Sequence, residues 1–246
     1  MGRVVIGVDE AGRGPVIGPL IVCAVEIPES DKNILEKIGV DDSKRLSKNK
    51  RSLIYDLIIK YSKKREWKIS IIICSSSRID LERQESNLNN LEVELFAEAI
   101  DAIGNTNQNR EIRVDACDTN QERFGKSIKS KLGVEWSDCD IISEHKMDEM
   151  DIIVGAASII AKITRDREIK LIESGIGFDI GSGYPSDPLT KNAVKKMISG
   201  KDIHPHLRWS WATVERAWNE IYDAPLPLRR QTNVTPNQTS SEKCSE

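Results

Sequence analysis

The sequence predicts an α/β protein in which a mixed β-sheet is flanked by helices and followed by a small helical C-terminal appendage. Apolar extended runs alternate with segments of helical periodicity, the pattern of folds that pack helices on a sheet. The first two runs lie close together, which favours an antiparallel hairpin at the start of the sheet. The glycine- and proline-rich segment Gly175–Pro188 then precedes two shorter helical segments. We therefore expect a main domain at 1–185, an appendage at 186–223 and a disordered tail at 224–246.

Five apolar runs predict the strands. Strand-forming residues are concentrated in them, and turn-forming or helical segments separate them. Helices lie between the later runs, so these strands are expected to pair in parallel after the initial hairpin. In chain order the runs are Val4–Val8, Leu20–Ile27, Trp67–Cys74, Ile112–Asp115 and Asp140–Ile142.

Helical periodicity and terminal residues predict the helices. Ser47 can cap a helix that places Leu53, Ile54, Leu57, Ile58 and Tyr61 on one face. The next helix begins near Leu88 and stops at Gly104, because glycine commonly ends a helix. The remaining expected helices are Gln121–Leu132, Ile152–Ser174, Leu189–Ser199 and Ser210–Tyr222.

Composition limits the classes of protein that the chain can belong to. Of its 246 residues, 39% are hydrophobic and 30% charged, as in ordinary globular domains. The longest apolar stretches, Ile69–Cys74 and Ile152–Ile163, are too short or too polar to span a bilayer, and we expect a cytoplasmic protein without a membrane partner. The five cysteines form no C-x-x-C pair, so neither zinc nor disulfides are indicated. With a net charge of −3, nucleic-acid binding would require a local basic surface.

Acidic residues follow two of the predicted strands. Asp9 and Glu10 come directly after the first apolar run, and Asp115 ends the fourth. Carboxylates at the edge of a core are costly unless they are hydrogen-bonded, paired or bound to a metal. In a regular strand Asp9 and Glu10 would point to opposite faces, so joint binding by both requires the chain to leave strand geometry at about Glu10.

Other acids have an alternative explanation as helix caps. Asp118 could cap the helix that follows it, and Glu149 and Asp151 lie where a helix N-terminus is predicted. Asp148 lies in the same stretch, and spacing alone does not choose among Asp148, Glu149 and Asp151. If several of these carboxylates converge, each close pair repels by about 4 kcal/mol at an intermediate dielectric, and such a cluster usually holds divalent cations. Oxygen ligands alone favour Mg²⁺ or Mn²⁺.

The glycine-rich turn after the first strand is not a dinucleotide-binding loop. Gly12, Gly14 and Gly18 have G-x-G-x-x-x-G spacing, and Pro15 and Pro19 oppose the helix that would have to follow. The turn can instead bring backbone N–H groups and the Arg13 guanidinium close to a polyanion.

These motifs, in this order, resemble those of type 2 ribonucleases H, the ribonuclease HII family, of the archaeal sort. The resemblance covers roughly Val4 to Tyr222. It rests on the stretches GVDEAGRGPVIGP, DDSKRLS, VDACD, HKMDEMD with AASIIAKITRDR, GSGYPSDP and HPHLRWSW.

The resemblance implies an RNase H-like fold and a catalytic domain at 1–185. It also implies hydrolysis of the RNA strand of RNA/DNA hybrids and cleavage of DNA duplexes that contain embedded ribonucleotides. The metal-binding and catalytic carboxylates would be Asp9, Glu10, Asp115 and Asp148, the last chosen by its position after HKM. The backbone of Gly12, Arg13 and Gly14, with Tyr184, would read the ribose 2′-hydroxyl. Judged without the resemblance, Tyr184 could equally well be an aromatic residue that is buried to hold its loop together.

Further contacts and partners are expected. Lys44, Lys146 and Arg165 adjoin these motifs and could contact phosphates, and His145 could touch substrate. We expect a monomer, and the tail lacks the Q-x-x-aliphatic-x-x-aromatic-aromatic pattern by which some archaeal relatives bind a sliding clamp. Two alternatives remain: another two-metal nuclease of the same fold, such as a junction resolvase or integrase-like enzyme, and a non-catalytic nucleic-acid-binding module.

Overall fold

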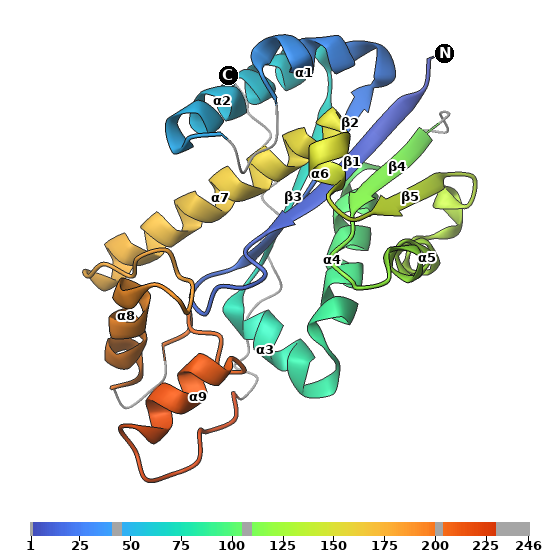
Figure 1. Ribbon diagram of the computed structural model, residues 1–246. Coiled ribbons are helices and arrows are strands. Elements are labelled where there is room, and N and C mark those ends of the chain that lie inside the picture. Colours follow the sequence, from blue (N-terminus) through green and yellow to red (C-terminus); the bar gives the residue numbers. More distant parts are fainter. Residues whose placement is uncertain (1, 41–45, 105–109, 200–203, 230–246) are drawn as a thin grey trace.

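A computed structural model describes residues 2–40, 46–104, 110–199 and 204–229. Its centre is a five-stranded sheet in the order β3-β2-β1-β4-β5 (Figure 1). Strands β1, β2 and β3 pair antiparallel, while β1, β4 and β5 pair in parallel. The expected mixed sheet with an initial hairpin is confirmed. The strands are β1 Val4–Ala11, β2 Leu20–Pro28, β3 Lys68–Cys74, β4 Arg110–Asp115 and β5 Asp140–Glu144.

Helices cover both faces of this sheet (Figure 1). On one face α1, α2 and α7 pack on Val5, Ile21 and Val25, and on the other α3, α4 and α5 pack on Ile6 and Val22. The alternation follows from the two-residue period of a strand. The helices are α1 Lys32–Ile38, α2 Lys48–Arg65, α3 Ser76–Glu85, α4 Leu88–Ile103, α5 Gln121–Lys131, α6 Met147–Met150, α7 Ile152–Ile176, α8 Pro188–Ile198 and α9 Ala212–Asn219.

Helix α7 crosses the sheet directly over β1. A Cβ atom on Gly7 would lie 2.6 Å from the backbone of Ile153 and Val154, so only glycine permits this approach. The long helix is thereby held against the strand that carries Asp9.

None of the helices formed by the described residues has the length and apolar composition needed to span a membrane.

The predicted helices are confirmed with small shifts of their ends. Ser47 caps α2 by accepting a hydrogen bond from the Lys50 amide, as expected. Leu53, however, is 61% exposed, so it does not share the buried face of α2 with Ile54 and Ile58. Helices α1, α3 and α6 were not predicted from periodicity, because each is short or largely polar and offers no clear apolar stripe.

The C-terminal helices share a core with the glycine-rich turn. Val16 and Ile17 pack in one cluster with residues of α7, α8 and α9, including Ile169, Val194 and Val214. The appendage therefore packs against the segment that follows β1 (Figure 1).

The first residues of the predicted tail make specific contacts, contrary to expectation. Arg229 is buried, forms an ion pair with Asp80 at 3.3 Å, and donates hydrogen bonds to the carbonyl oxygens of Pro205 and Leu207. Composition did not indicate this, because the contact is made by one long charged side chain rather than by apolar residues. Residues 230–246 lie outside the described residues, and the prediction of disorder there is untested.

The contacts of Arg229 predict different stabilities for two truncated proteins. Deleting 230–246 should leave the melting temperature and turnover nearly unchanged, because that stretch is almost devoid of large apolar residues. Deleting 224–246 also removes Arg229 from Asp80. We expect a loss of about 2 kcal/mol and a melting temperature lower by roughly 4–8 °C. Thermal unfolding of both proteins checks this, and equal melting temperatures would contradict it.

Candidate functional site

Asp9 and Asp115 lie side by side on neighbouring parallel strands. In the pairing of β1 with β4, Val8 is opposite Val114, so the next residue of each strand lies at the same edge of the sheet. Carboxyl ends of parallel strands are where such folds gather functional groups. The two acids that end apolar strands in the sequence are thus brought together as expected.

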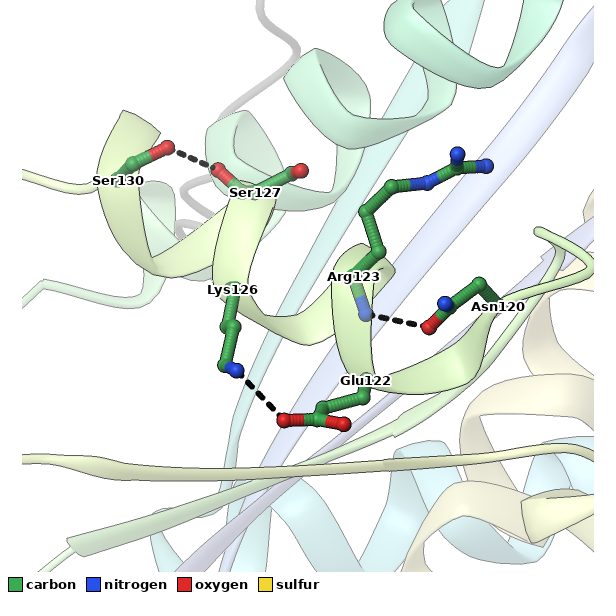
Figure 2. A pocket seen from close by; sticks show the side chains of 6 residues that line it. All are labelled: Asn120, Glu122, Arg123, Lys126, Ser127 and Ser130. Atoms are coloured by element: carbon green, nitrogen blue, oxygen red, sulfur yellow. Dashed lines mark hydrogen bonds and ion pairs between the residues drawn. The ribbon is translucent and has the colours of Figure 1, made fainter.

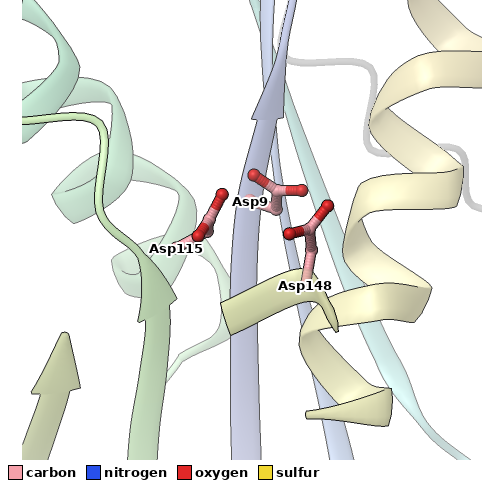
Figure 3. A group of neighbouring side chains, drawn as sticks. All are labelled: Asp9, Asp115 and Asp148. Carbon is pink, nitrogen blue, oxygen red and sulfur yellow. The ribbon is translucent and has the colours of Figure 1, made fainter. Parts of the chain in front are cut away.

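Asp148 completes the group from the short helix α6. The Met147 amide donates a hydrogen bond of 2.8 Å to Asp115 Oδ1, which holds the start of α6 against β4. One carboxylate oxygen from each of Asp9, Asp115 and Asp148 lies within 4.8 Å of the others. Figure 3 shows the three side chains directed toward one another. Geometry therefore distinguishes Asp148 from Glu149, whose side chain is exposed, and from Asp151.

The cluster is poorly solvated. Asp9 is 3% and Asp148 4% exposed, and Asp115 is half-buried. Burial, together with the charge of Glu10, raises the pKa of Asp9 well above its usual range. Three carboxylates so close together and so little exposed repel one another strongly unless a cation balances them.

Two residues of α7 support the cluster and were missed in the sequence. Lys162 Nζ lies 4.0 Å from Asp148 Oδ2 and donates a hydrogen bond of 3.0 Å to Ser158 Oγ. The charge of Lys162 and a hydrogen bond from Ser158 both lower the pKa of Asp9, against the larger effect of burial. The signal was the i, i+4 spacing of Ser158 and Lys162 in the otherwise apolar first half of α7.

The backbone conformation at Glu10 differs from the expectation. β1 continues in regular pairing as far as Ala11 opposite Ile21, so the chain does not leave strand geometry at Glu10. Glu10 is not one of the three clustered acids, although its carboxyl interacts with that of Asp9. Burial raises the pKa of Glu10, and the charges of Glu92 and Asp115 raise it further.

A buried acid also holds Arg13. Glu92 on α4 is fully buried and forms an ion pair with the Arg13 guanidinium, which also donates 2.8 Å to Asn89 Oδ1. Burial raises the pKa of Glu92 to about 7, despite the opposing effect of Arg13. Sequence reasoning missed Glu92; its signal was an acidic residue on the apolar face of a predicted helix.

The glycine-rich turn lies against the Tyr184 loop. A Cβ atom on Gly14 would lie 3.3 Å from Tyr184 Cε1, so the two residues are in contact. The Arg165 guanidinium lies over the Tyr184 ring at 5.3 Å and donates hydrogen bonds to the Ser182 carbonyl and to Asp166. Arg165 thus holds the loop that carries Tyr184, which is itself 41% exposed.

The other acidic candidates have structural partners. Asp151 is the N-cap of α7 and accepts from the amides of Ile153 and Val154, as the cap interpretation predicted. Asp118 is not the cap of α5, because Asn120 occupies that position. Asp118 instead pairs with Arg123, and this contact lowers its pKa to about 2.

Two of the basic candidates, His145 and Lys146, precede α6 and are exposed. Lys146 is exposed and begins α6 with a left-handed backbone, and His145 Nε2 lies 2.7 Å from the Asp118 carbonyl oxygen. Lys44 lies outside the described residues. A surface pocket on α5 contains none of the three clustered acids, and its side chains pair locally (Figure 2). Its lining residues are Asn120, Glu122, Arg123, Lys126, Ser127 and Ser130.

Comparison with known proteins gives a consistent result. A family model described as Ribonuclease HII matches residues 6–214. The ribonuclease HII of Methanococcus maripaludis strain C6 is 40% identical over 226 residues, 92% of this chain and 91% of that protein.

Similar solved structures belong to the same family. The ribonuclease H2 of Pyrococcus horikoshii superposes with a TM-score of 0.77 at 37% identity, over 88% of this chain and 98% of that one. The ribonuclease HII of Archaeoglobus fulgidus, solved as a complex with PCNA, gives 0.72 at 32% identity, over 94% and 98% of the two chains. Of the three functional hypotheses, these similarities support the first, the metal-dependent endoribonuclease.

Proposed function

Because this chain belongs to the ribonuclease HII family, we propose that Asp9, Asp115 and Asp148 are the ligands with which it holds divalent cations for catalysis. The chain is an endoribonuclease that acts on the RNA strand of RNA/DNA hybrids. The observation that carries the proposal is the approach of three carboxylates, two buried and one half-buried, to within 4.8 Å of one another.

The donor set fits Mg²⁺ or Mn²⁺. All three groups offer hard carboxylate oxygens, and a divalent cation would offset the repulsion among them. When bound, such ions activate a water molecule and stabilise the leaving 3′ oxygen of a phosphodiester. We propose Glu10 as a fourth carboxylate, acting beside Asp9 rather than within the group of three.

The remaining residues would orient the ligands and the substrate. Lys162 and Ser158 hold the α7 side of the cluster. The backbone of Gly12, Arg13 and Gly14 and the Tyr184 ring are proposed to read the ribose, including that of a ribonucleotide embedded in DNA. The contacts of Arg165 favour a role in positioning Tyr184 over a direct phosphate contact. Phosphate contacts by Lys44 and Lys146 stay predictions.

Activity should depend on added divalent metal. We expect turnover on an RNA/DNA hybrid to fall to background in excess chelator and to return when Mg²⁺ or Mn²⁺ is added beyond the chelator, because the proposed ligands are all oxygens. Comparing the two ions in the same assay identifies the better one. Full activity in chelator, after metal analysis shows that the protein is metal-free, would contradict the proposal.

A monomeric, cytoplasmic enzyme stays our expectation, and the missing clamp-binding pattern puts a sliding-clamp partnership in doubt. The Archaeoglobus relative binds PCNA in its solved structure. Most of the tail that lacks the clamp-binding pattern, residues 230–246, lies outside the described residues. Size-exclusion chromatography with and without a clamp protein tests the oligomeric state and this partnership together.

A further inference from the structure

Arg208 is a fully buried arginine whose hydrogen-bond acceptors are backbone carbonyls of the glycine-rich turn. Its Nη2 donates 2.6 Å to the Gly12 carbonyl, Nη1 3.0 Å to that of Arg13, and Nε 2.9 Å to that of Gly18. Burial lowers the pKa of Arg208 to about 10, so the guanidinium stays charged at neutral pH. A buried charge is costly, and this one is used to hold one turn.

Other N–H groups of the segment around Arg208 also donate hydrogen bonds to carbonyls of the turn. The Arg208 amide donates to the Val16 carbonyl at 2.9 Å, and Trp211 Nε1 donates to the Gly14 carbonyl at 3.2 Å. The Arg208 guanidinium also lies 4.9 Å from the centre of the Trp211 ring, within cation–π distance. The carbonyl side of the turn is therefore held by the segment between α8 and α9.

The orientation of these carbonyls determines where the amides point. In a trans peptide the C=O and N–H groups point in opposite directions, and the described chain contains no cis peptide. The carbonyls of Gly12 and Arg13 belong to the same peptide groups as the amides of Arg13 and Gly14. By binding the two carbonyls, Arg208 directs the two amides to the opposite side of the turn.

We propose that Arg208 is a positioning residue for ribose recognition: by binding the Gly12 and Arg13 carbonyls, it aims the Arg13 and Gly14 amides at the substrate sugar. This inference rests on the proposed role of the turn in reading the 2′-hydroxyl. It gives the C-terminal appendage a part in substrate specificity, because the residue that orients the turn belongs to the segment between α8 and α9.

The test compares Arg208→Met with Arg229→Met in the full-length chain. Both side chains are buried arginines that bind backbone carbonyls, but Arg229 binds those of Pro205 and Leu207 and not those of the turn. Affinity is measured by fluorescence anisotropy for two duplexes of one sequence, one all-DNA and one with a single ribonucleotide, in a buffer with Ca²⁺ and with the duplex checked to be uncut.

We expect the preference of Arg208→Met for the ribonucleotide duplex to fall by about tenfold, as for loss of one hydrogen bond, while its affinity for all-DNA changes little. Arg229→Met should keep the wild-type preference even if its melting temperature falls. Arg208→Lys keeps the charge but has its N–H donors on one nitrogen instead of three. It should retain part of the preference, and it carries the test if Arg208→Met does not fold.

Three results would overturn the inference. An unchanged preference in Arg208→Met, or in Arg208→Lys where that variant carries the test, shows that the guanidinium does not orient the amides. An equal loss in Arg229→Met shows general loosening of the appendage. A wild-type protein without any preference contradicts the recognition role of the turn itself, and so is distinguishable from a failure of Arg208 alone.

Discussion

Asp9→Asn should reduce cleavage of an RNA/DNA hybrid by about a thousandfold or more, equivalent to roughly 4 kcal/mol of transition-state stabilisation. Asparagine keeps the size of the side chain but removes the charge and one of the acceptor oxygens that the cluster offers to a cation. Affinity for the duplex should change little, because the turn and the Tyr184 loop are untouched. Single-turnover cleavage and anisotropy measure the two effects separately.

Asp151→Asn is the matched control for this substitution. Asp151 is also a buried aspartate, but it caps α7 and pairs with Arg113 and Lys32. We expect a lower melting temperature and turnover within about threefold of wild type. Near-normal turnover in Asp9→Asn, or an equal loss in both variants, would contradict the assigned role of Asp9.

Gly14→Val should reduce kcat/KM on a duplex with one ribonucleotide by about a hundredfold, since a displacement of about 1 Å can have that effect. A Cβ atom at this position already lies 3.3 Å from Tyr184 Cε1, and the two valine methyl groups would displace the ring or occupy the space beside it. The three clustered acids are not touched. Circular dichroism and Mn²⁺ titration should therefore match the wild type.

Gly12→Ala separates recognition from turn geometry. Gly12 has φ +95°, and a Cβ atom there would lie 2.8 Å from the Pro19 carbonyl oxygen, so alanine should destabilise the fold. Unchanged cleavage by Gly14→Val would remove the recognition role of that position. Unfolding of Gly14→Val, like that of Gly12→Ala, would mean that both glycines serve only to form the turn.

The sequence was sufficient for the sheet and for two members of the cluster. Asp9 and Asp115 each end an apolar strand, and parallel pairing brings such ends together. Asp148 could not be chosen from spacing, because Glu149 and Asp151 lie in the same stretch. The choice depends on how the short helix α6 is held by the hydrogen bond from Met147 to Asp115.

Charged residues that pair inside the protein are the main features that the sequence did not reveal. Glu92, Lys162 and Arg208 are ordinary charged residues in the sequence, and their roles depend on partners that come from distant segments. Arg229 was missed for the same reason, since its partner Asp80 lies on a helix that periodicity did not reveal. For Glu10 only the expected backbone conformation was wrong: the glycine-rich turn permits a departure from strand geometry, but the pairing with β2 continues through Ala11.

The most direct test is cleavage of three duplexes of one sequence that carry zero, one or many ribonucleotides in one strand, assayed with Mg²⁺ or Mn²⁺. A site that combines clustered carboxylates with a ribose-reading turn should cut the second and third duplexes and leave the all-DNA duplex intact. Cleavage of the all-DNA duplex at a comparable rate would contradict ribose recognition, and failure to cut any of the three with either ion would contradict the assignment of the cluster as a catalytic site.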